Sequence, residues 1–168
     1  RWSCITVRPG RNADTLAETI SITGSGSDPG LSSDGNLVNT ASAASSGSDA
    51  GLSGALAYAL TLSPLAVVRF KLQETTGVRS FIGLANQSLT TMVGADDPAG
   101  HYAGLQFSTP RTDTNFQFVT KDGSTQGLSD SGVAVDTALH TLVIYLDSTG
   151  SRVVFQLDDT TQVIRTAN

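Results

Sequence analysis

The sequence contains few of the residues that an exposed helix normally displays. Charged residues make up only 15% of its 168 residues, and lysine and glutamate occur twice each, at Lys71, Lys121, Glu18 and Glu74. Both residue types form helices readily. Glycine instead occurs 17 times, and serine and threonine are frequent, which suits strands and turns. The composition therefore predicts an all-β protein.

Other scarcities argue against whole classes of partner and function. The single cysteine, Cys4, leaves no second thiol for an internal disulfide. No apolar run approaches the length of a membrane-spanning helix, which is about 18 residues or more. The net charge is −5 and the basic residues are scattered, whereas binding to phosphates needs clustered lysine and arginine. We therefore expect neither nucleic acid nor a membrane among the partners.

Apolar and polar residues alternate with period two in many short segments. In "LAVVRFKLQE", for example, Val68, Phe70 and Leu72 fall on one face, with Arg69 and Lys71 on the other. No window has a convincing helical period. The pattern predicts a two-sheet antiparallel β-sandwich of the jelly-roll type. The expected strands are SCITV, AETISIT, NLVNTA, GALAYALTL, LAVVRFKLQE, VRSFIGLAN, YAGLQFST, NFQFVTKDG, SGVAV, LHTLVIYLD, RVVFQLD and QVIR.

Residues 24–54 differ from the rest because glycine, serine, aspartate and alanine dominate them. We expect an irregular Gly/Ser-rich N-terminal arm that lies on a surface, with true flexibility as the alternative. The chain is accordingly divided into residues 1–53, with N-terminal strands and the arm, and residues 54–168, the β-sandwich. Fixing a backbone costs on the order of 1 to 2 kcal/mol per residue. An ordered arm would therefore need support from sister subunits or a capsid surface.

The segments RFKLQETTGVRSFIGLAN, AGLQFST, NFQFVTKDG and HTLVIYLDSTGSRVVFQLDD follow one another in an order that resembles a known fold. It is similar to the concanavalin A-like jelly roll of legume lectins and laminin G-like domains, over roughly the last hundred residues. The small-residue segment ahead of it resembles capsid-decoration and fibre proteins of tailed bacteriophages, which often trimerise.

Catalytic chemistry finds little support among the residues. Glycoside hydrolases that share this fold need two carboxylates placed across the scissile bond. The E-x-D-x-E motif of one such group is absent, and Glu18 and Glu74 are isolated. His101 and His140 are far apart in sequence, and His140 is expected to be packed or hydrogen-bonded rather than a metal ligand. We predict that the chain is not an enzyme and has no catalytic residues.

Two kinds of binding site remain open. Tyr102 and Trp2 are the candidate sugar contacts, because an exposed aromatic ring can stack on a pyranose. The alternatives are a half-buried strand residue for Tyr102 and an anchor on a neighbouring subunit for Trp2. Asn86, Asp96 and Asp97 are weak calcium candidates, since calcium prefers oxygen ligands. No regular D-x-D-x-D loop is present, so we predict no metal and no cofactor.

These expectations favour a structural protein of a tailed phage, either a capsid-decoration (cement) protein or part of a tail fibre. It would be located on the virion as a homo-oligomer, most simply a trimer, and would contact the major capsid protein or other virion proteins. The alternative is a carbohydrate-binding, lectin-like module that attaches to host glycans.

Overall fold

The computed structural model describes residues 2–7, 18–23, 27–31, 38–41, 49–54, 63, 65–149 and 151–165, with side chains for 63, 65–149, 151–160 and 162. Most of these residues belong to strands. The elements are β1 (Trp2–Val7), β2 (Glu18–Thr23), β3 (Ser27–Leu31), β4 (Val38–Ala41), β5 (Asp49–Gly54), β6 (Leu65–Leu72), β7 (Arg79–Ala85), α1 (Leu89–Gly94), β8 (His101–Ser108), β9 (Asn115–Asp122), β10 (Gln126–Ala134), β11 (Leu139–Leu146), β12 (Arg152–Leu157) and β13 (Thr160–Arg165).

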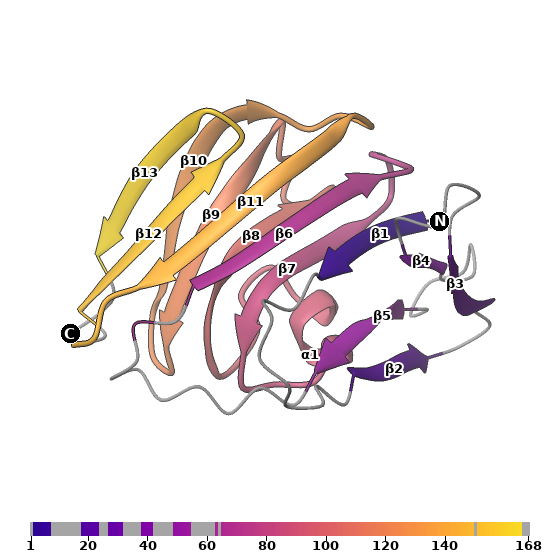
Figure 1. The fold of residues 1–168 in the computed structure, drawn as a ribbon, viewed down its shortest axis with the longest axis horizontal. Coiled ribbons are helices and arrows are strands. Elements are labelled where there is room, and N and C mark those ends of the chain that lie inside the picture. Colours follow the sequence, from indigo (N-terminus) through magenta and orange to yellow (C-terminus); the bar gives the residue numbers. More distant parts are fainter. Residues whose placement is uncertain are drawn as a thin grey trace.

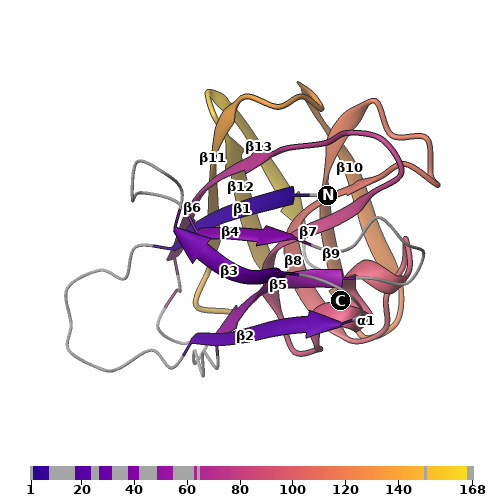
Figure 2. The ribbon, with the colours of Figure 1, turned by 90° about the vertical axis from the view of Figure 1, so that its right-hand side faces the viewer.

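Two antiparallel sheets face each other and form a β-sandwich, as the alternation predicted (Figure 1). The larger sheet has the order β13-β12-β11-β6-β1-β4-β3, and the smaller has the order β10-β9-β8-β7. Strands β2 and β5 form a separate two-stranded sheet, which lies beside α1 in both views (Figure 2). The all-β, two-sheet fold class is therefore confirmed.

The N-terminal strands extend the larger sheet. β1 pairs with β6, for example Ile5 with Phe70, and β4 and β3 continue the sheet beyond β1. The described parts of the glycine- and serine-rich segment are thus the three short strands β3, β4 and β5. The expected strand in NLVNTA is confirmed as β4, whereas the expected strand in GALAYALTL lies outside the described residues. The division of the chain near residue 54 stays a prediction.

The core lies between the two sheets and is rich in phenylalanine. Phe118 of β9 stacks on Phe155 of β12, with 5.0 Å between ring centroids, so this pair joins the two sheets. Phe116 meets Phe70 edge-on, at 5.5 Å. All four side chains are fully or almost fully buried. Burying each such side chain contributes about 1.5–3 kcal/mol, which makes this cluster a main source of stability.

His140 is part of this core, and its expected structural role is confirmed. Its ring is buried and lies against Phe70 and Phe116. Nδ1 is 2.7 Å from Asp158 Oδ2, and Nε2 is 3.0 Å from Asp136 Oδ1. The histidine thus connects the start of β11 with the β12–β13 turn and with the loop before β11.

Side chains at the turns fix the strand register. Gly123 closes the β9–β10 hairpin with φ +100°, a conformation that side chains other than glycine rarely adopt. The Asp122 carboxylate accepts hydrogen bonds from the backbone and hydroxyl of Ser124. The Asp-Gly turn signal at this place is therefore confirmed.

One short helix departs from the sequence prediction, which had no helix here. α1 begins after Ser88, whose hydroxyl accepts a hydrogen bond from the backbone N–H of Thr91. Its length of six residues is too short for a helical period to be recognised in the sequence. Within the described residues, no helix has the length and apolar character needed to cross a membrane.

Candidate functional site

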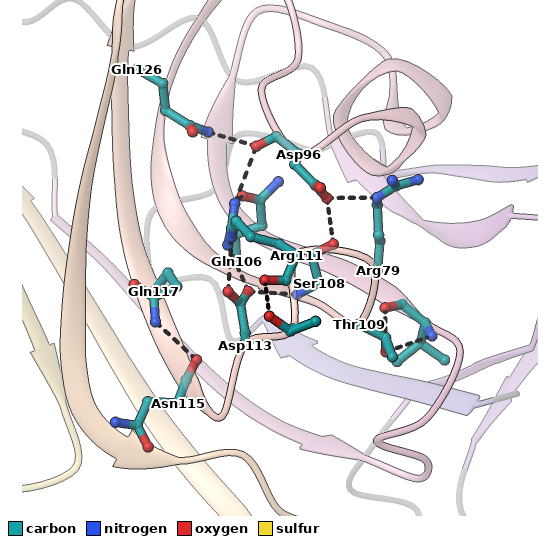
Figure 3. Close-up of polar contacts among 12 residues, drawn as sticks. Arg79, Asp96, Gln106, Ser108, Thr109, Arg111, Asp113, Asn115, Gln117 and Gln126 are labelled. Carbon is teal, nitrogen blue, oxygen red and sulfur yellow. Dashed lines mark hydrogen bonds and ion pairs between the residues drawn. The ribbon is translucent and has the colours of Figure 1, made fainter.

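The outer face of the smaller sheet carries a cluster of hydrogen-bonded polar side chains (Figure 3). Along β8, Leu105 and Phe107 point into the core, so Gln106 and Ser108 fall on the opposite face. Both of these polar residues are nonetheless buried, at 1% and 0% exposure. A buried polar face needs a polar cover, because an unpaired polar group costs about 1–3 kcal/mol.

The loop that follows α1 supplies this cover. Asp96 accepts a hydrogen bond from Arg79 Nε at 2.8 Å and another from the Ser108 hydroxyl (Figure 3). The Asp96 carbonyl accepts from Gln126 Nε2 at 2.8 Å and from Arg111 Nη1 at 3.3 Å. The loop is therefore fastened to three strands and to the turn after β8.

Arg111 occupies the centre of the cluster (Figure 3). It binds Asp113 through two parallel contacts, Nε to Oδ1 at 2.8 Å and Nη2 to Oδ2 at 2.7 Å, and it donates to Gln106 Oε1 at 2.8 Å. Asp113 also accepts from the Ser108 backbone N–H. Such a two-point contact is the strongest common form of arginine–carboxylate pair.

The Asp96 carboxyl is held in its ionised form. Burial alone would raise its pKa, but the hydrogen bonds from Ser108 and Arg79, together with the positive charges of Arg79 and Arg111, lower the pKa below its usual value. The carboxylate thus forms its hydrogen bonds with groups of the protein itself, and these bonds hold the loop that follows α1 in place.

Tyr102 and Asp97, two of the predicted binding residues, are brought into direct contact. The Tyr102 hydroxyl donates to Asp97 Oδ1 at 3.2 Å and accepts from Gln126 Nε2 at 3.0 Å. Lys121 Nζ binds the same Asp97 oxygen at 2.7 Å. Burial, assisted by the Asp97 charge and opposed by Gln126, raises the pKa of Tyr102 to about 12.

The ring of Tyr102 is therefore placed differently from a sugar-stacking platform. Its exposure is 5%, and it packs with Met92 of α1, with Val119 and with Phe81. The alternative prediction was a half-buried strand residue, and the side chain is buried more completely than that. The Trp2 side chain lies outside the described side chains; its backbone belongs to β1, opposite Ala41 of β4.

The three calcium candidates have different partners. Asp96 binds Arg79 and Ser108, and Asp97 binds Lys121 and Tyr102. Asn86 Oδ1 accepts from the His101 backbone N–H at 2.8 Å. Among the residues that the structure describes, no group of three or more histidine, cysteine, aspartate or glutamate side chains is arranged to hold a metal ion.

A second feature lies on the outer side of the larger sheet, and we call it the broad face. It consists of the outward-facing residues of β6, β11 and β12: Leu65, Val67, Arg69, Lys71, Leu139, Thr141, Val143, Tyr145, Arg152, Val154 and Gln156. Register places Val67 opposite Val143, and Tyr145 opposite both Leu65 and Val154. Leu65, Val67 and Tyr145 are exposed by 61%, 47% and 38%.

Sequence reasoning did not identify either feature as a unit. The alternation in YAGLQFST does place Gln106 and Ser108 on one face, but the loop that covers them comes from residues 95–98. The broad face also follows from alternation, yet the neighbours of β6 become known only from the strand order. Strand order depends on long-range pairing, which short motifs do not contain.

Comparison with known proteins adds no family: no protein-family model, no curated protein and no solved structure matches the chain.

Proposed function

We propose that the chain is a non-catalytic structural protein of a tailed-bacteriophage virion, a capsid-decoration protein or a fibre component, built on a concanavalin A-like jelly roll. The broad face carries the proposal, because it exposes neighbouring large apolar side chains from two adjacent strands, β6 and β11. Contiguous apolar surface of this kind marks contact sites in soluble proteins. The resemblance of the segments from Arg69 onward and of the small-residue segment before them supplies the viral context.

The polar cluster on the smaller sheet fits the same role. Its three cations, Arg79, Arg111 and Lys121, are each paired with a carboxylate, Asp96, Asp113 or Asp97. Paired charges joined to backbone groups hold a loop in one shape. A surface whose charged side chains are paired with one another suits a structural protein, which needs a fixed shape in order to assemble.

Purified virions of the source phage provide the test. Mass spectrometry should find this chain in a fixed ratio to the major capsid protein or to a tail protein, and antibodies against the recombinant chain should label intact particles. A chain that is found in the infected-cell lysate but is absent from washed particles would refute the proposal.

A lectin-like role is the second candidate, and one observation favours it. Tyr145 has an exposed side chain opposite Val154 of β12, and Gln156 lies two residues further along β12 on the same face. An exposed tyrosine beside polar groups can stack on a sugar. A glycan array should then give a signal that Tyr145→Ala removes and that Tyr102→Phe, a change at a buried ring, retains.

A further inference from the structure

The buried ring of His140 lies between two carboxylates, one against each of its nitrogens. Nδ1 is 2.7 Å from Asp158 Oδ2, and Nε2 is 3.0 Å from Asp136 Oδ1. A neutral imidazole has one N–H group and one bare nitrogen, which can only accept a hydrogen bond. An ionised carboxylate has no proton to donate to that nitrogen. Both contacts are therefore hydrogen bonds at the same time only if the ring carries two protons and a positive charge.

Backbone groups hold both carboxylates in place as acceptors. Asp158 Oδ1 accepts from the Thr141 backbone N–H at 2.8 Å, which directs the other oxygen toward the ring. Asp136 Oδ1 also accepts from the Ala138 backbone N–H at 2.6 Å. This bond, opposed by burial and assisted by the contact with His140 and by its charge, lowers the pKa of Asp136 below the usual value. Asp136 is therefore an ionised acceptor near neutral pH.

The backbone at Asp158 indicates that its side chain has a purpose. Its φ is +51°, a left-handed conformation that glycine adopts most easily and that aspartate tolerates better than most residues. The carboxylate at this position provides the contacts with Thr141 and His140. The β12–β13 turn thus carries a carboxylate where the backbone alone would favour glycine.

No other charged group pairs with the ring of His140 within the described part of the chain. Of the elements packed against it, β6 and β9 contribute the phenylalanine rings of the core. Arg69 and Lys71 of β6 lie on the outer face of the sheet, whereas His140 faces the core. Asp159, the next residue in the β12–β13 turn, forms no ion pair with it. The charge of the ring is therefore balanced by the two carboxylates alone.

We propose that Asp136, a doubly protonated His140 and Asp158 form a pH-sensitive clasp. The protonated ring binds the loop before β11 and the β12–β13 turn at the same time. When the pH rises, the ring gives one proton to water and can donate only one of the two hydrogen bonds. The Nε2 proton leaves, because the Asp136 side chain is 54% exposed and can turn to solvent, whereas Thr141 also holds Asp158. The loop is then released while the turn stays attached. This inference does not depend on the proposed virion role.

The direction of the pH effect follows from the charges. The clasp is complete where an imidazole holds both protons and carboxylates are ionised, which is between about pH 4 and about pH 6. The folded state favours the charged ring, so the contribution of the clasp to stability is present at the lower pH and is lost as the pH rises.

NMR of the histidine ring nitrogens in the full chain tests the protonation directly. The chain has two histidines, and His101, which is exposed and forms no ion pair within the described residues, is the internal control. Both nitrogens of His140 should show the chemical shift of protonated nitrogen, and should keep it to about one pH unit or more above the pH at which His101 titrates. Asp158→Asn should reduce this difference. Asp159→Asn removes the same charge from the same turn and should retain it.

Urea unfolding shows whether the charged contact supports the fold. The difference in urea midpoint between wild type and Asp136→Asn should be larger at about pH 6 than at about pH 8, and the difference between wild type and Asp159→Asn should be the same at both. A bare ring nitrogen on His140 at about pH 6, or titration of both histidines together, would show that His140 is a neutral packed residue. Equal midpoint differences for Asp136→Asn at both pH values would show that no clasp opens. If a variant does not fold, the titration of the wild-type chain still decides.

Discussion

Replacing Arg111 with methionine should destabilise the fold through one buried carboxylate. The guanidinium makes two contacts with Asp113, one with Gln106 and one with the Asp96 carbonyl. Without it, Asp113 keeps only the Ser108 backbone N–H, although its side chain is just 6% exposed. An uncompensated charge at such a site is costly.

The size of the effect follows from the burial of the pair. Breaking a fully buried ion pair costs roughly 3–5 kcal/mol. The Arg111 side chain is 18% exposed, so water can reach part of the site in the variant, and we expect a loss of about 2–3 kcal/mol. For a domain of this size, about 2–4 °C in Tm accompanies each kcal/mol, so Tm should fall by about 5–10 °C.

Urea unfolding followed by tryptophan fluorescence or circular dichroism measures this loss. Arg111→Lys keeps the charge but not the two-point geometry, and it should lie between the wild type and Arg111→Met. In a double-mutant cycle with Asp113→Asn, the coupling between the two residues should be roughly 1–2 kcal/mol. If Arg111→Met stays within about 0.5 kcal/mol of Asp159→Asn, a surface change, the cluster does not fasten the loop as described.

Three further predictions concern the core, one close backbone contact and the pH dependence. Phe118→Ala removes the ring that stacks on Phe155 and should cost about 3–5 kcal/mol in urea unfolding, whereas a cost below about 1 kcal/mol would contradict the two-sheet core. Gly104→Ala would place a Cβ 2.6 Å from the Ile82 carbonyl oxygen and should destabilise the folded state by about 1–3 kcal/mol. In the control Gly94→Ala, the added Cβ would meet no atom within 4 Å, so this change should be neutral or slightly stabilising. Equal effects of the two changes would refute the close contact at Gly104. Because the folded-state pKa of Asp96 lies below its unfolded value, the contribution of this carboxylate to stability is complete above about pH 4 and disappears as the pH falls through the folded pKa. The difference in urea midpoint between wild type and Asp96→Asn should therefore shrink on acidification. A constant difference from about pH 7 to about pH 2 would contradict this.

Much of the local structure could be predicted from side-chain alternation. The faces of β6 and β12 follow directly from the spacing of Val68, Phe70 and Leu72 and of Val153, Phe155 and Leu157. Alternation succeeds here because successive side chains in a strand point to opposite faces and only one face is covered by the core. Asp-Gly at residues 122–123 is equally local, since glycine accepts the positive φ that the turn requires.

The candidate site could not be predicted in the same way. Alternation places Tyr102, Gln106 and Ser108 on one face, but it does not show that α1 and the loop after it cover that face. Tyr102 therefore looked like a candidate sugar contact, although it is a buried residue bonded to Asp97 and Gln126. Whether a polar residue is exposed to solvent or hydrogen-bonded within the protein depends on segments that are distant in sequence.

From Leu65 onward, α1 apart, the sequence alone determined the strand character, the inward and outward faces of the strands and the Asp-Gly turn, because each depends on neighbouring residues. Only the tertiary structure decided which strands are adjacent, and hence that Arg69 and Lys71 of β6 share a face with Tyr145 of β11 and Arg152 of β12. It also decided that the Asp96 carboxylate pairs with Arg79 and the Ser108 hydroxyl. Both results come from long-range pairing, in which the free energy of the whole sandwich selects the partners.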